Sequence, residues 1–411
     1  MGVARRARDL AAGAAGAVTA RRHLLPARLD RALDVAKWAR TPWTADACDV
    51  PTLVSPRSGR PARVLVGPAN FAGQGLAWAS ALDRAGVPAV CWAFAADPRF
   101  RFGADHRAPL TAVHRASRAY QRRVFDRVVE TVEAVVIEAG RPLFGRLHGY
   151  DPVAEAHALQ AHGVRVALLW HGTDIRVPSV HAATHPDSPF GTADARTRSL
   201  EAVALRNRRR AAAFDGPVLV STPDLLPVWP GARWCPVIVD ADTWSSDEPL
   251  LARDRPLVVH APSNRALKGT DLVERAVGTL EGEGLLTYRE VAGVPADEVR
   301  DLYRGADVVL DQFRLGIYGV AACEAMAAGR VVVSQVDAQV RAEVAATGHA
   351  LPVRDTAPDG LEATLRDVVT DRARARELAA RGPAFVRALH DGRRSASVLV
   401  DALGLEAPAD R

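Results

Sequence analysis

Short runs of consecutive apolar residues alternate with stretches of helical periodicity along most of the chain, beginning with ARVLVGPA at 62–69. The next apolar runs, which predict further strands, lie at 87–94, 134–140, 164–172 and 216–223. Helical stretches separate them, around 75–86, 115–132, 152–162 and 194–213. Strands that are apolar throughout are typical of a parallel sheet covered by helices on both faces. The pattern therefore predicts a doubly wound α/β domain.

The alternation pauses at 237–256, which is polar, acidic and interrupted by prolines, and then resumes. The later apolar runs lie at 257–263, 286–294, 307–313 and 330–336. A chain of 411 residues exceeds one ordinary core, so we interpret the pause as a boundary between two doubly wound domains. The predicted divisions are an N-terminal extension, an N-terminal domain, a C-terminal domain and a C-terminal helix with its tail, at 1–61, 62–245, 246–395 and 396–411. Ligands bind such sheets at the carboxyl ends of the strands, so a ligand held between two domains is expected in a cleft.

Composition changes this picture little, because 48% hydrophobic and 25% charged residues are typical of a soluble globular protein. No apolar run approaches the roughly 18 residues that a membrane span needs. The cysteines have no paired spacing, which favours a reducing compartment, and hence the cytoplasm, over a disulfide framework or a zinc site. They are Cys48, Cys91, Cys235 and Cys323.

Charge and histidine spacing exclude two further classes of site. The net charge of +5 is modest, and the basic residues form no continuous stripe with interleaved aromatics, so we expect no nucleic-acid partner. His181 and His185 have a helical spacing that a metal could use, but no acidic third ligand is placed with them. We interpret HAATH at 181–185 as a hydrophilic loop and expect no metal.

The stretch GIYGVAACEAMAAGRVVV at 316–333 contains the first candidate for chemistry. It predicts a helix from Tyr318 to Gly329 that is apolar on every side except for one carboxylate, Glu324. An unpaired carboxylate in such a helix costs several kcal/mol, so Glu324 needs hydrogen-bond donors. Two sources of donors stay open: an arginine of a neighbouring element, or a pair of hydroxyls on a ligand.

The start of this helix favours the ligand. Gly316 and Gly319 stand where a backbone must approach another group closely. The free N–H groups of Gly319, Val320 and Ala321 would favour negative charge at the helix end. A phosphate at the helix end and hydroxyls one turn deeper describe the phosphate–ribose segment of a nucleotide.

The counterpart is HAPSNRALKGTDLVERA at 260–275, where a predicted strand ends at His260 and a loop carries Arg265 and Lys268. Of 53 basic residues only two are lysines, Lys37 and Lys268. A lysine is a compact point charge, suited to a diphosphate, whereas an arginine presents a larger planar fork. The alternative for Lys268 is a surface lysine without a role.

The motifs at 260–275 and 306–333, together with WHGTDIR at 170–176, resemble glycosyltransferase family 4. The resemblance covers most of 62–395 and implies the GT-B fold, in which two Rossmann-like doubly wound parallel-sheet domains face each other across a cleft. It also implies a retaining, metal-independent transfer from a nucleotide-sugar donor held by the C-terminal domain, with no cofactor besides that substrate.

By this resemblance Lys268, with Arg265, holds the diphosphate, and Gly319 opens the phosphate-binding helix beside Tyr318 and Val320. Glu324 takes the ribose hydroxyls, and AGVP at 292–295, with Val294, lies near the nucleotide base. The stretch PVIVDADTW at 236–244 is similar to the hinge of the family, through Pro236, Val239 and Asp240, although the usual Asn-Gly is Val-Ile.

One departure from the family concerns the donor sugar. Many members carry a second glutamate eight positions before the first, near the sugar, and here that position is Gly316. The resemblance therefore requires the sugar hydroxyls to be contacted by backbone amides around 316–318 or by another side chain.

In the N-terminal domain, His171 follows an apolar strand and would face the cleft, where it bonds a sugar hydroxyl, steadies the transferring group, or only caps its own loop. Asp174 and Arg176 either pair with each other or line the acceptor side. Gly73 and Gly75 in NFAGQG would let the backbone approach the diphosphate or the acceptor. Without a third glycine they are weak evidence for a dinucleotide.

The sequence thus predicts a retaining glycosyltransferase acting on a sugar, lipid-linked or small-molecule acceptor in cell-surface glycan, glycolipid or natural-product glycosylation. The alternatives are a catalytically silent nucleotide-sugar-binding GT-B protein and a GT-B nucleotide-sugar epimerase or hydrolase. The basic N-terminus is compatible with a peripheral contact at the inner face of the membrane. Its arginines are Arg5, Arg6, Arg8, Arg21 and Arg22.

Overall fold

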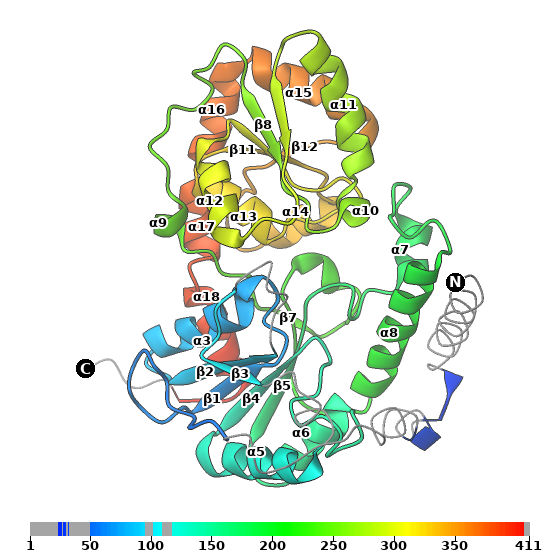
Figure 1. The fold of residues 1–411 in the computed structure, drawn as a ribbon, viewed down its shortest axis with the longest axis vertical. Coiled ribbons are helices and arrows are strands. Elements are labelled where there is room, and N and C mark those ends of the chain that lie inside the picture. Colours follow the sequence, from blue (N-terminus) through cyan, green and yellow to red (C-terminus); the bar gives the residue numbers. More distant parts are fainter. Residues whose placement is uncertain are drawn as a thin grey trace, which may run out of the picture.

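The computed structural model describes residues 50–94, 102–108 and 117–406, together with 24–26, 28, 29 and 32. The chain forms two lobes, each built on a parallel sheet (Figure 1). The N-terminal lobe has a seven-stranded sheet in the order β3-β2-β1-β4-β5-β6-β7. The C-terminal lobe has a five-stranded sheet in the order β12-β11-β10-β8-β9. These two sheets confirm the predicted pair of doubly wound α/β domains. The arginines predicted to meet a membrane lie outside the described residues.

The strands of the N-terminal lobe include all five that the apolar runs predicted. They are β1 (Val64–Gly67), β2 (Ala89–Phe94), β4 (Ala134–Glu138), β5 (Arg165–Trp170) and β6 (Val218–Val220). Two strands were missed, β3 (His106–Ala108) and β7 (Arg233–Trp234). Both are short, partly polar strands at the edges of the sheet, where no long apolar run is needed. In the centre, Val64 of β1 pairs in parallel with Ala89 and Ala134.

Helices cover both faces of this sheet (Figure 1). They are α3 (Gln74–Arg84), α5 (Arg118–Thr131), α6 (Pro152–Gln160), α8 (Ala195–Ala211) and α18 (Arg393–Ala402). Helix α7 (Pro178–Thr184) packs against α8, away from the sheet (Figure 1). Helix α5 begins where Ser117 accepts a hydrogen bond from the backbone N–H of Tyr120. The interpretation of HAATH as a loop is wrong, because most of it lies in α7 and His181 is buried. Proline at the start of α7 is a helix signal, but seven residues are too few to show a period.

The C-terminal lobe follows the prediction closely. Its strands are β8 (Leu257–His260), β9 (Thr287–Glu290), β10 (Val308–Leu310), β11 (Val331–Ser334) and the short edge strand β12 (Arg354–Asp355). A short helix, α9 (Ala241–Trp244), lies in the segment that connects the lobes. The helices of the C-terminal lobe are α10 (Arg265–Lys268), α11 (Thr270–Gly282), α12 (Ala296–Gly305), α13 (Val320–Ala327), α14 (Ala338–Ala345), α15 (Leu361–Thr370), α16 (Arg372–Ala380) and α17 (Gly382–Leu389).

The last helix, α18, returns to the N-terminal lobe, where it lies beside α3 (Figure 1). Its residues Ala396 and Leu399 are buried in the same cluster as Val64 and Val66. Burying a leucine side chain contributes about 1.5–3 kcal/mol, so the helix is anchored there. The two crossings between the lobes also touch, because the N–H of Val239 donates to the carbonyl of His390 at 2.9 Å.

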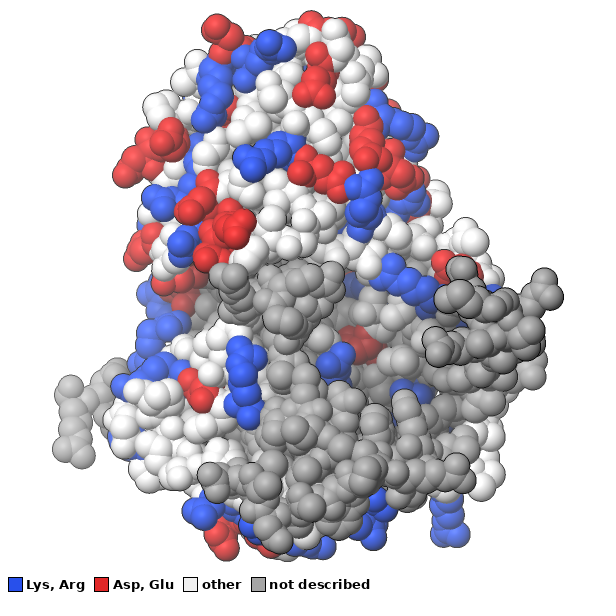
Figure 2. Space-filling view, viewed as in Figure 1, with Lys and Arg blue, Asp and Glu red and all other residues white. Residues whose placement is uncertain are grey.

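The strand order places one ligand-binding edge on each sheet. The order reverses between β8 and β10 in the C-terminal lobe and between β1 and β4 in the N-terminal lobe. Loops that leave such neighbouring strands diverge and open a crevice at their carboxyl ends. Acidic and basic side chains are interspersed over the C-terminal lobe on the face shown in Figure 2, so that face carries no field of a single sign. Among the described helices, none is both long and apolar enough to cross a bilayer.

Candidate functional site

A cavity of about 650 Å³ opens at the carboxyl edge of the five-stranded sheet, where the order of β8 and β10 reverses. Most of its wall comes from the C-terminal lobe. Ala72 and Phe102 of the N-terminal lobe and Trp244 of the connecting segment complete it. Among the residues predicted from sequence, Arg265, Lys268, Val294, Val320 and Glu324 line it together.

Lys268 is held at the cavity wall by an aspartate that the sequence analysis did not single out. Lys268 ends α10, which begins after Asn264, whose side chain accepts from the N–H of Leu267 at 3.1 Å. The ammonium of Lys268 forms an ion pair with Oδ1 of Asp311, a buried residue that follows β10. The other oxygen of Asp311, Oδ2, is buried without a donor among the described residues. The ion pair holds the positive charge of Lys268 at the cavity wall. Among the described residues, Lys268 is the ion-pair partner of the Asp311 carboxylate.

Glu324 lies one turn inside α13, which begins at Val320 after Gly319. Its side chain lines the cavity with Val320 and Ala321, as their spacing on one helix face requires. No described residue forms an ion pair with Glu324, so the structure does not support the alternative of an arginine partner. Burial raises the pKa of Glu324 to about 8, the nearby charge of Asp311 adds to the rise, and Lys268 opposes it. Among the described residues, no ion-pair partner therefore meets the need of this carboxylate for donors.

The raised pKa predicts how stability depends on pH. Because the pKa of Glu324 rises on folding from 4.5 to about 8, the folded protein binds this proton more tightly than the unfolded chain. Its contribution to stability is complete below pH 4.5 and is lost as the pH rises through about 8. We expect the unfolding temperature of the wild type to fall relative to that of Glu324→Gln between pH 6 and pH 9, without nucleotide and at constant ionic strength. Unfolding temperatures that change in parallel would contradict the assignment.

Arg265 also lines the cavity, but its guanidinium is already engaged. It forms ion pairs with Glu290 and with Glu274, the latter at 2.7 Å, and its side chain is half exposed. Hydrogen bonds to Glu290 and then to Glu274 raise the pKa of Arg265 above its ordinary value. A diphosphate would have to compete with both carboxylates, so Lys268 is the cation better placed for it.

The side of the cavity beyond β9 is apolar. Gly293 and Val294 follow β9, and Val299 and Tyr303 face them from α12. The rings of Tyr303 and Trp244 lie 5.9 Å apart. This apolar wall includes Val294, whose predicted contact with a nucleotide base stays a prediction.

Three of the predicted donor-binding residues, Gly316, Tyr318 and Gly319, are not among the residues that line this cavity. Tyr318 is buried, and its hydroxyl lies 3.3 Å from Nε2 of His390 in the core. Gly316 has a left-handed backbone, with φ of 67°, and its open side faces the carboxylate of Asp337. Their positions shape the loop that leads into α13 and present no side chain to the cavity.

In the N-terminal lobe, His171 follows β5 and bonds a buried carboxylate. Its Nε2 lies 3.1 Å from Oε1 of Glu138, the last residue of β4. The other oxygen of Glu138 accepts from the N–H of Asn70 at 3.1 Å. The imidazole also contacts the rings of Phe71 and Trp78, with centroids 5.2 and 5.5 Å away. Glu138 thus fixes the orientation of His171 beside the end of β4. His171 is not among the residues that line the cavity described above, so its place in the cleft stays a prediction.

The remaining predicted residues of this lobe have local roles. Asp174 accepts from the backbone N–H groups of His171 and Gly172, so it, and not His171, caps the loop. Arg176 forms an ion pair with Asp224, and no contact joins Arg176 to Asp174 among those of the described residues.

The two glycines near the start of α3 serve packing. Gly73 has φ of 73° and precedes the helix, facing Phe102. Gly75 is buried where a Cβ would lie 2.8 Å from Oε2 of Glu138. This close approach explains the glycine at position 75 without requiring a ligand.

Sequence reasoning missed three carboxylates beside the predicted residues. Glu138 and Asp311 each end or follow an apolar strand, which was a usable signal, because a carboxylate there needs a partner. Asp337 also follows an apolar strand, β11, but its contacts with Gly316 and His185 come from distant parts of the chain and could not be read from the sequence. In the described ranges, no group of three His, Cys, Asp or Glu side chains is arranged to hold a metal ion.

Comparison with solved structures identifies the architecture. The chain is similar to sucrose-phosphate synthase from Thermosynechococcus elongatus, with a TM-score of 0.53 and 16% identity over 82% of this chain and 97% of that one. Anabaena HepE in complex with UDP-glucose matches with a TM-score of 0.53 and 12% identity over 83% and 99%. The catalytic domain of starch synthase IV from Arabidopsis thaliana, bound to ADP and acarbose, matches with a TM-score of 0.50 and 11% identity over 81% and 99%.

These similarities confirm the predicted GT-B fold, with two Rossmann-like domains facing across a cleft. They extend over nearly the whole of the matched chains. No protein-family model and no curated protein matches the sequence.

Proposed function

We propose that the chain is a retaining glycosyltransferase that moves a sugar from a nucleotide-diphosphate sugar to an acceptor hydroxyl. One observation carries the proposal: a single cavity at the reversal point of the C-terminal sheet brings together Lys268, the N-terminus of α13 and Glu324. A cation and free backbone N–H groups suit a diphosphate, and a carboxylate one turn deeper suits the hydroxyls of a ribose.

The reaction requires stabilisation of the charge that develops on the leaving diphosphate. In the proposed mechanism the bond between the anomeric carbon and the phosphate oxygen breaks, and the acceptor oxygen bonds to that carbon on the same face. The acceptor proton passes to the leaving phosphate oxygen, so no nucleophile of the protein is required. Lys268 and the N–H groups at the start of α13 stabilise the diphosphate, and Asp311 holds Lys268 in place.

The opposite wall of the cleft would act on the transferred sugar or the acceptor. His171 is oriented by Glu138 and packed between Phe71 and Trp78, which limits its movement. In this proposal it donates to or accepts from a sugar hydroxyl as the lobes approach each other.

Two structural neighbours give the proposal its chemical context. HepE has been solved with UDP and with UDP-glucose, and starch synthase IV with ADP and acarbose. Their identities of 11 to 13% carry the fold alone, so the choice of nucleotide, sugar and acceptor is left to experiment. A cytoplasmic location, with an acceptor that is a sugar, a lipid-linked intermediate or a small molecule, completes the proposal.

A ligand panel followed by a turnover assay tests the function. Thermal unfolding is measured with UDP, GDP, ADP and the corresponding nucleotide sugars, because a ligand at 100 times its Kd stabilises the folded state by about 2.7 kcal/mol. We expect one nucleotide class to raise the unfolding temperature. Its sugar nucleotide should be consumed only when an acceptor is added.

The rival functions give different results in the same experiment. Consumption of the sugar nucleotide without acceptor indicates an epimerase or hydrolase. Binding without transfer across a broad acceptor panel indicates a silent binding protein. No shift with any nucleotide contradicts all of these functions.

A further inference from the structure

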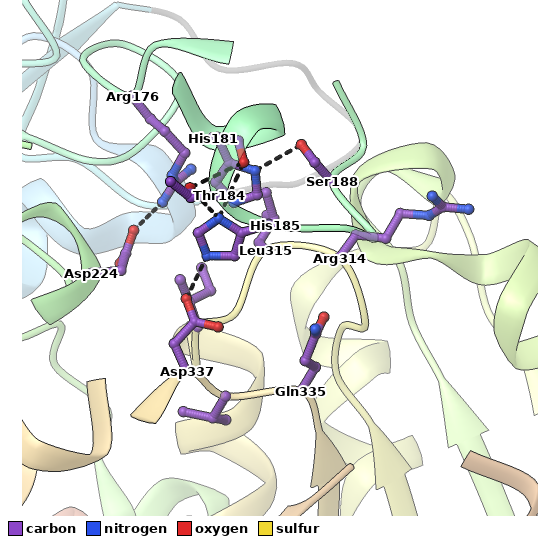
Figure 3. Close-up of polar contacts among 12 residues, drawn as sticks. Arg176, His181, Thr184, His185, Ser188, Asp224, Arg314, Leu315, Gln335 and Asp337 are labelled. Carbon is purple, nitrogen blue, oxygen red and sulfur yellow. Dashed lines mark hydrogen bonds and ion pairs between the residues drawn. The ribbon is translucent and has the colours of Figure 1, made fainter. Parts of the chain in front are cut away.

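A second cavity, of about 620 Å³, lies between the two lobes beyond the loop that leads into α13 (Figure 3). Helices α7 and α8 of the N-terminal lobe form one wall, and Leu315, Asp337 and Val340 of the C-terminal lobe form the other. Val177, Val180 and Leu315 make part of this lining apolar. Its polar groups include His181 of α7, His185 directly after that helix and Asp337 at the start of α14.

Asp337 occupies an unusual position for an aspartate at a helix start. It is the N-cap of α14, yet its side chain makes no capping bond. Such a bond is worth about 1 kcal/mol to a helix, so this aspartate leaves an available stabilising contact unused. Its backbone N–H donates to the carbonyl of Gly316 at 2.9 Å, and its carboxylate turns toward the cavity.

The glycine at 316 makes this orientation of Asp337 possible. Gly316 has φ of 67°, and a Cβ there would lie 2.2 Å from Oδ2 of Asp337. The carboxylate therefore fills the space that a side chain at position 316 would occupy. Gly316 has no side chain, and the carboxylate of Asp337 lies where the side chain of residue 316 would otherwise be.

A histidine from the opposite lobe reaches the same carboxylate. Nε2 of His185 lies 2.6 Å from Oδ2 of Asp337, across the cleft (Figure 3). His185 stacks on His181, with ring centroids 4.0 Å apart, and Nδ1 of His181 bonds the hydroxyl of Ser188 at 2.8 Å. Burial lowers the pKa of His181 to about 4, so the ring beneath His185 is neutral at ordinary pH.

The His185–Asp337 contact is open to competition by a ligand. The two side chains are 24% and 32% exposed. Ion pairs exposed to this degree contribute about 0–1 kcal/mol, so sharing the carboxylate with a hydroxyl costs little. The neighbouring Arg176–Asp224 pair is far less exposed, at 5% and 9%, and forms a fixed part of the wall.

The strand order gives the direction in which a bound donor would extend. Along the carboxyl edge, Val294 follows β9, Lys268 follows β8, α13 follows β10 and Asp337 follows β11. A base beside Val294 and a diphosphate at Lys268 and α13 therefore place the next group toward β11. Gly316 is three residues from Gly319, so their Cα atoms are at most about 11 Å apart, and the carboxylate of Asp337 lies against Gly316.

We propose that Asp337 and His185 form the hydroxyl-binding subsite for the donor sugar. The carboxylate of Asp337 accepts hydrogen bonds from hydroxyls of the pyranose ring, and His185, whose Nε2 bonds that carboxylate, positions it from the other lobe. This inference rests on the proposed function and extends it, because it assigns sugar recognition to a carboxylate on the β11 side of the edge.

The test compares a nucleotide with its own sugar ester. Calorimetry measures the affinity of UDP, GDP or ADP, whichever binds, and of the matching UDP-glucose, GDP-mannose or ADP-glucose, for wild type and Asp337→Asn. We expect the variant to bind the nucleotide within about twofold of wild type and the nucleotide sugar about tenfold more weakly, since a hydrogen bond to a charged group is lost. The KM for the donor should rise in the same proportion.

Two further variants separate this role from a structural one. Asp371→Asn changes another N-cap aspartate of the same lobe, whose side chain does cap its helix, and should leave both affinities unchanged. Gly316→Ala retains Asp337 but places a methyl group against its carboxylate, and should reproduce the selective loss.

Equal losses of nucleotide and nucleotide sugar in Asp337→Asn, or no loss of either, overturn the subsite while leaving the proposed function intact. If the wild type binds no nucleotide, the proposed function fails and the subsite with it. Asparagine is also a good N-cap residue, so Asp337→Asn should fold and keep the test valid if Gly316→Ala does not.

Discussion

Replacing Lys268 by alanine should lower kcat by about two to three orders of magnitude, which is the usual effect of removing one preorganised group that stabilises developing charge. The ammonium is the cation of the cavity that is held by a single buried partner, Asp311. Initial rates with the donor identified in the ligand panel would measure the loss.

The structure also predicts a complication for this variant. Without Lys268 the buried carboxylate of Asp311 is left unpaired, which costs about 3–5 kcal/mol in buried pairs. The double variant Lys268→Ala with Asp311→Asn removes that charge, and should recover the unfolding temperature but not the turnover. Recovery of both would show that Lys268 acts only on stability.

Arg265→Ala provides the matched comparison. Because Arg265 is already bound by Glu274 and Glu290, its loss should lower kcat much less than the loss of Lys268. A larger effect for Arg265 would reverse the assignment of the main cation.

The second large effect is expected for Glu324→Ala, which should weaken nucleotide binding by about 10- to 100-fold, the range for losing two hydrogen bonds to the ribose hydroxyls. The protein itself should not lose stability, because the removed carboxyl group lies near the charge of Asp311 and has a raised pKa. Calorimetry with the nucleoside diphosphate measures the change in Kd. Glu377→Gln, whose side chain is 70% exposed on α16, is the control and should bind like wild type.

A deoxynucleotide identifies the group that Glu324 contacts. For wild type, the 2′-deoxynucleoside diphosphate should bind more weakly than the ribonucleotide, whereas Glu324→Ala should bind both equally. If the variant discriminates as strongly as wild type, Glu324 does not contact this hydroxyl.

The sequence identified the cavity residues where their chemistry conflicted with their surroundings. Glu324 was the one carboxylate in an apolar helix, and Lys268 was one of two lysines in the chain. Both conflicts are local, so they can be recognised without coordinates. His171 and Gly319 were identified by their place at the end of a strand and the start of a helix, and the structure places them there.

The sequence predicted the positions of the site residues better than the side chains that they bond. Asp311 and Glu138 orient Lys268 and His171, but each pairing depends on strands that are adjacent only in the sheet. Tyr318 was expected beside the donor, yet its side chain turns into the core against His390. The direction of a side chain at a loop–helix junction depends on packing that no local pattern records.

By itself, the sequence determined the two parallel-sheet domains and the elements that carry the cation and the acid, because apolar runs and helical periods reflect burial within each element. Only the tertiary structure decided that Asp337 fills the space beside Gly316 and meets His185 from the other lobe, 152 positions away. The physical reason is that burial and periodicity are properties of neighbouring residues, whereas a contact across a cleft exists only once the strand order and the approach of the lobes are set.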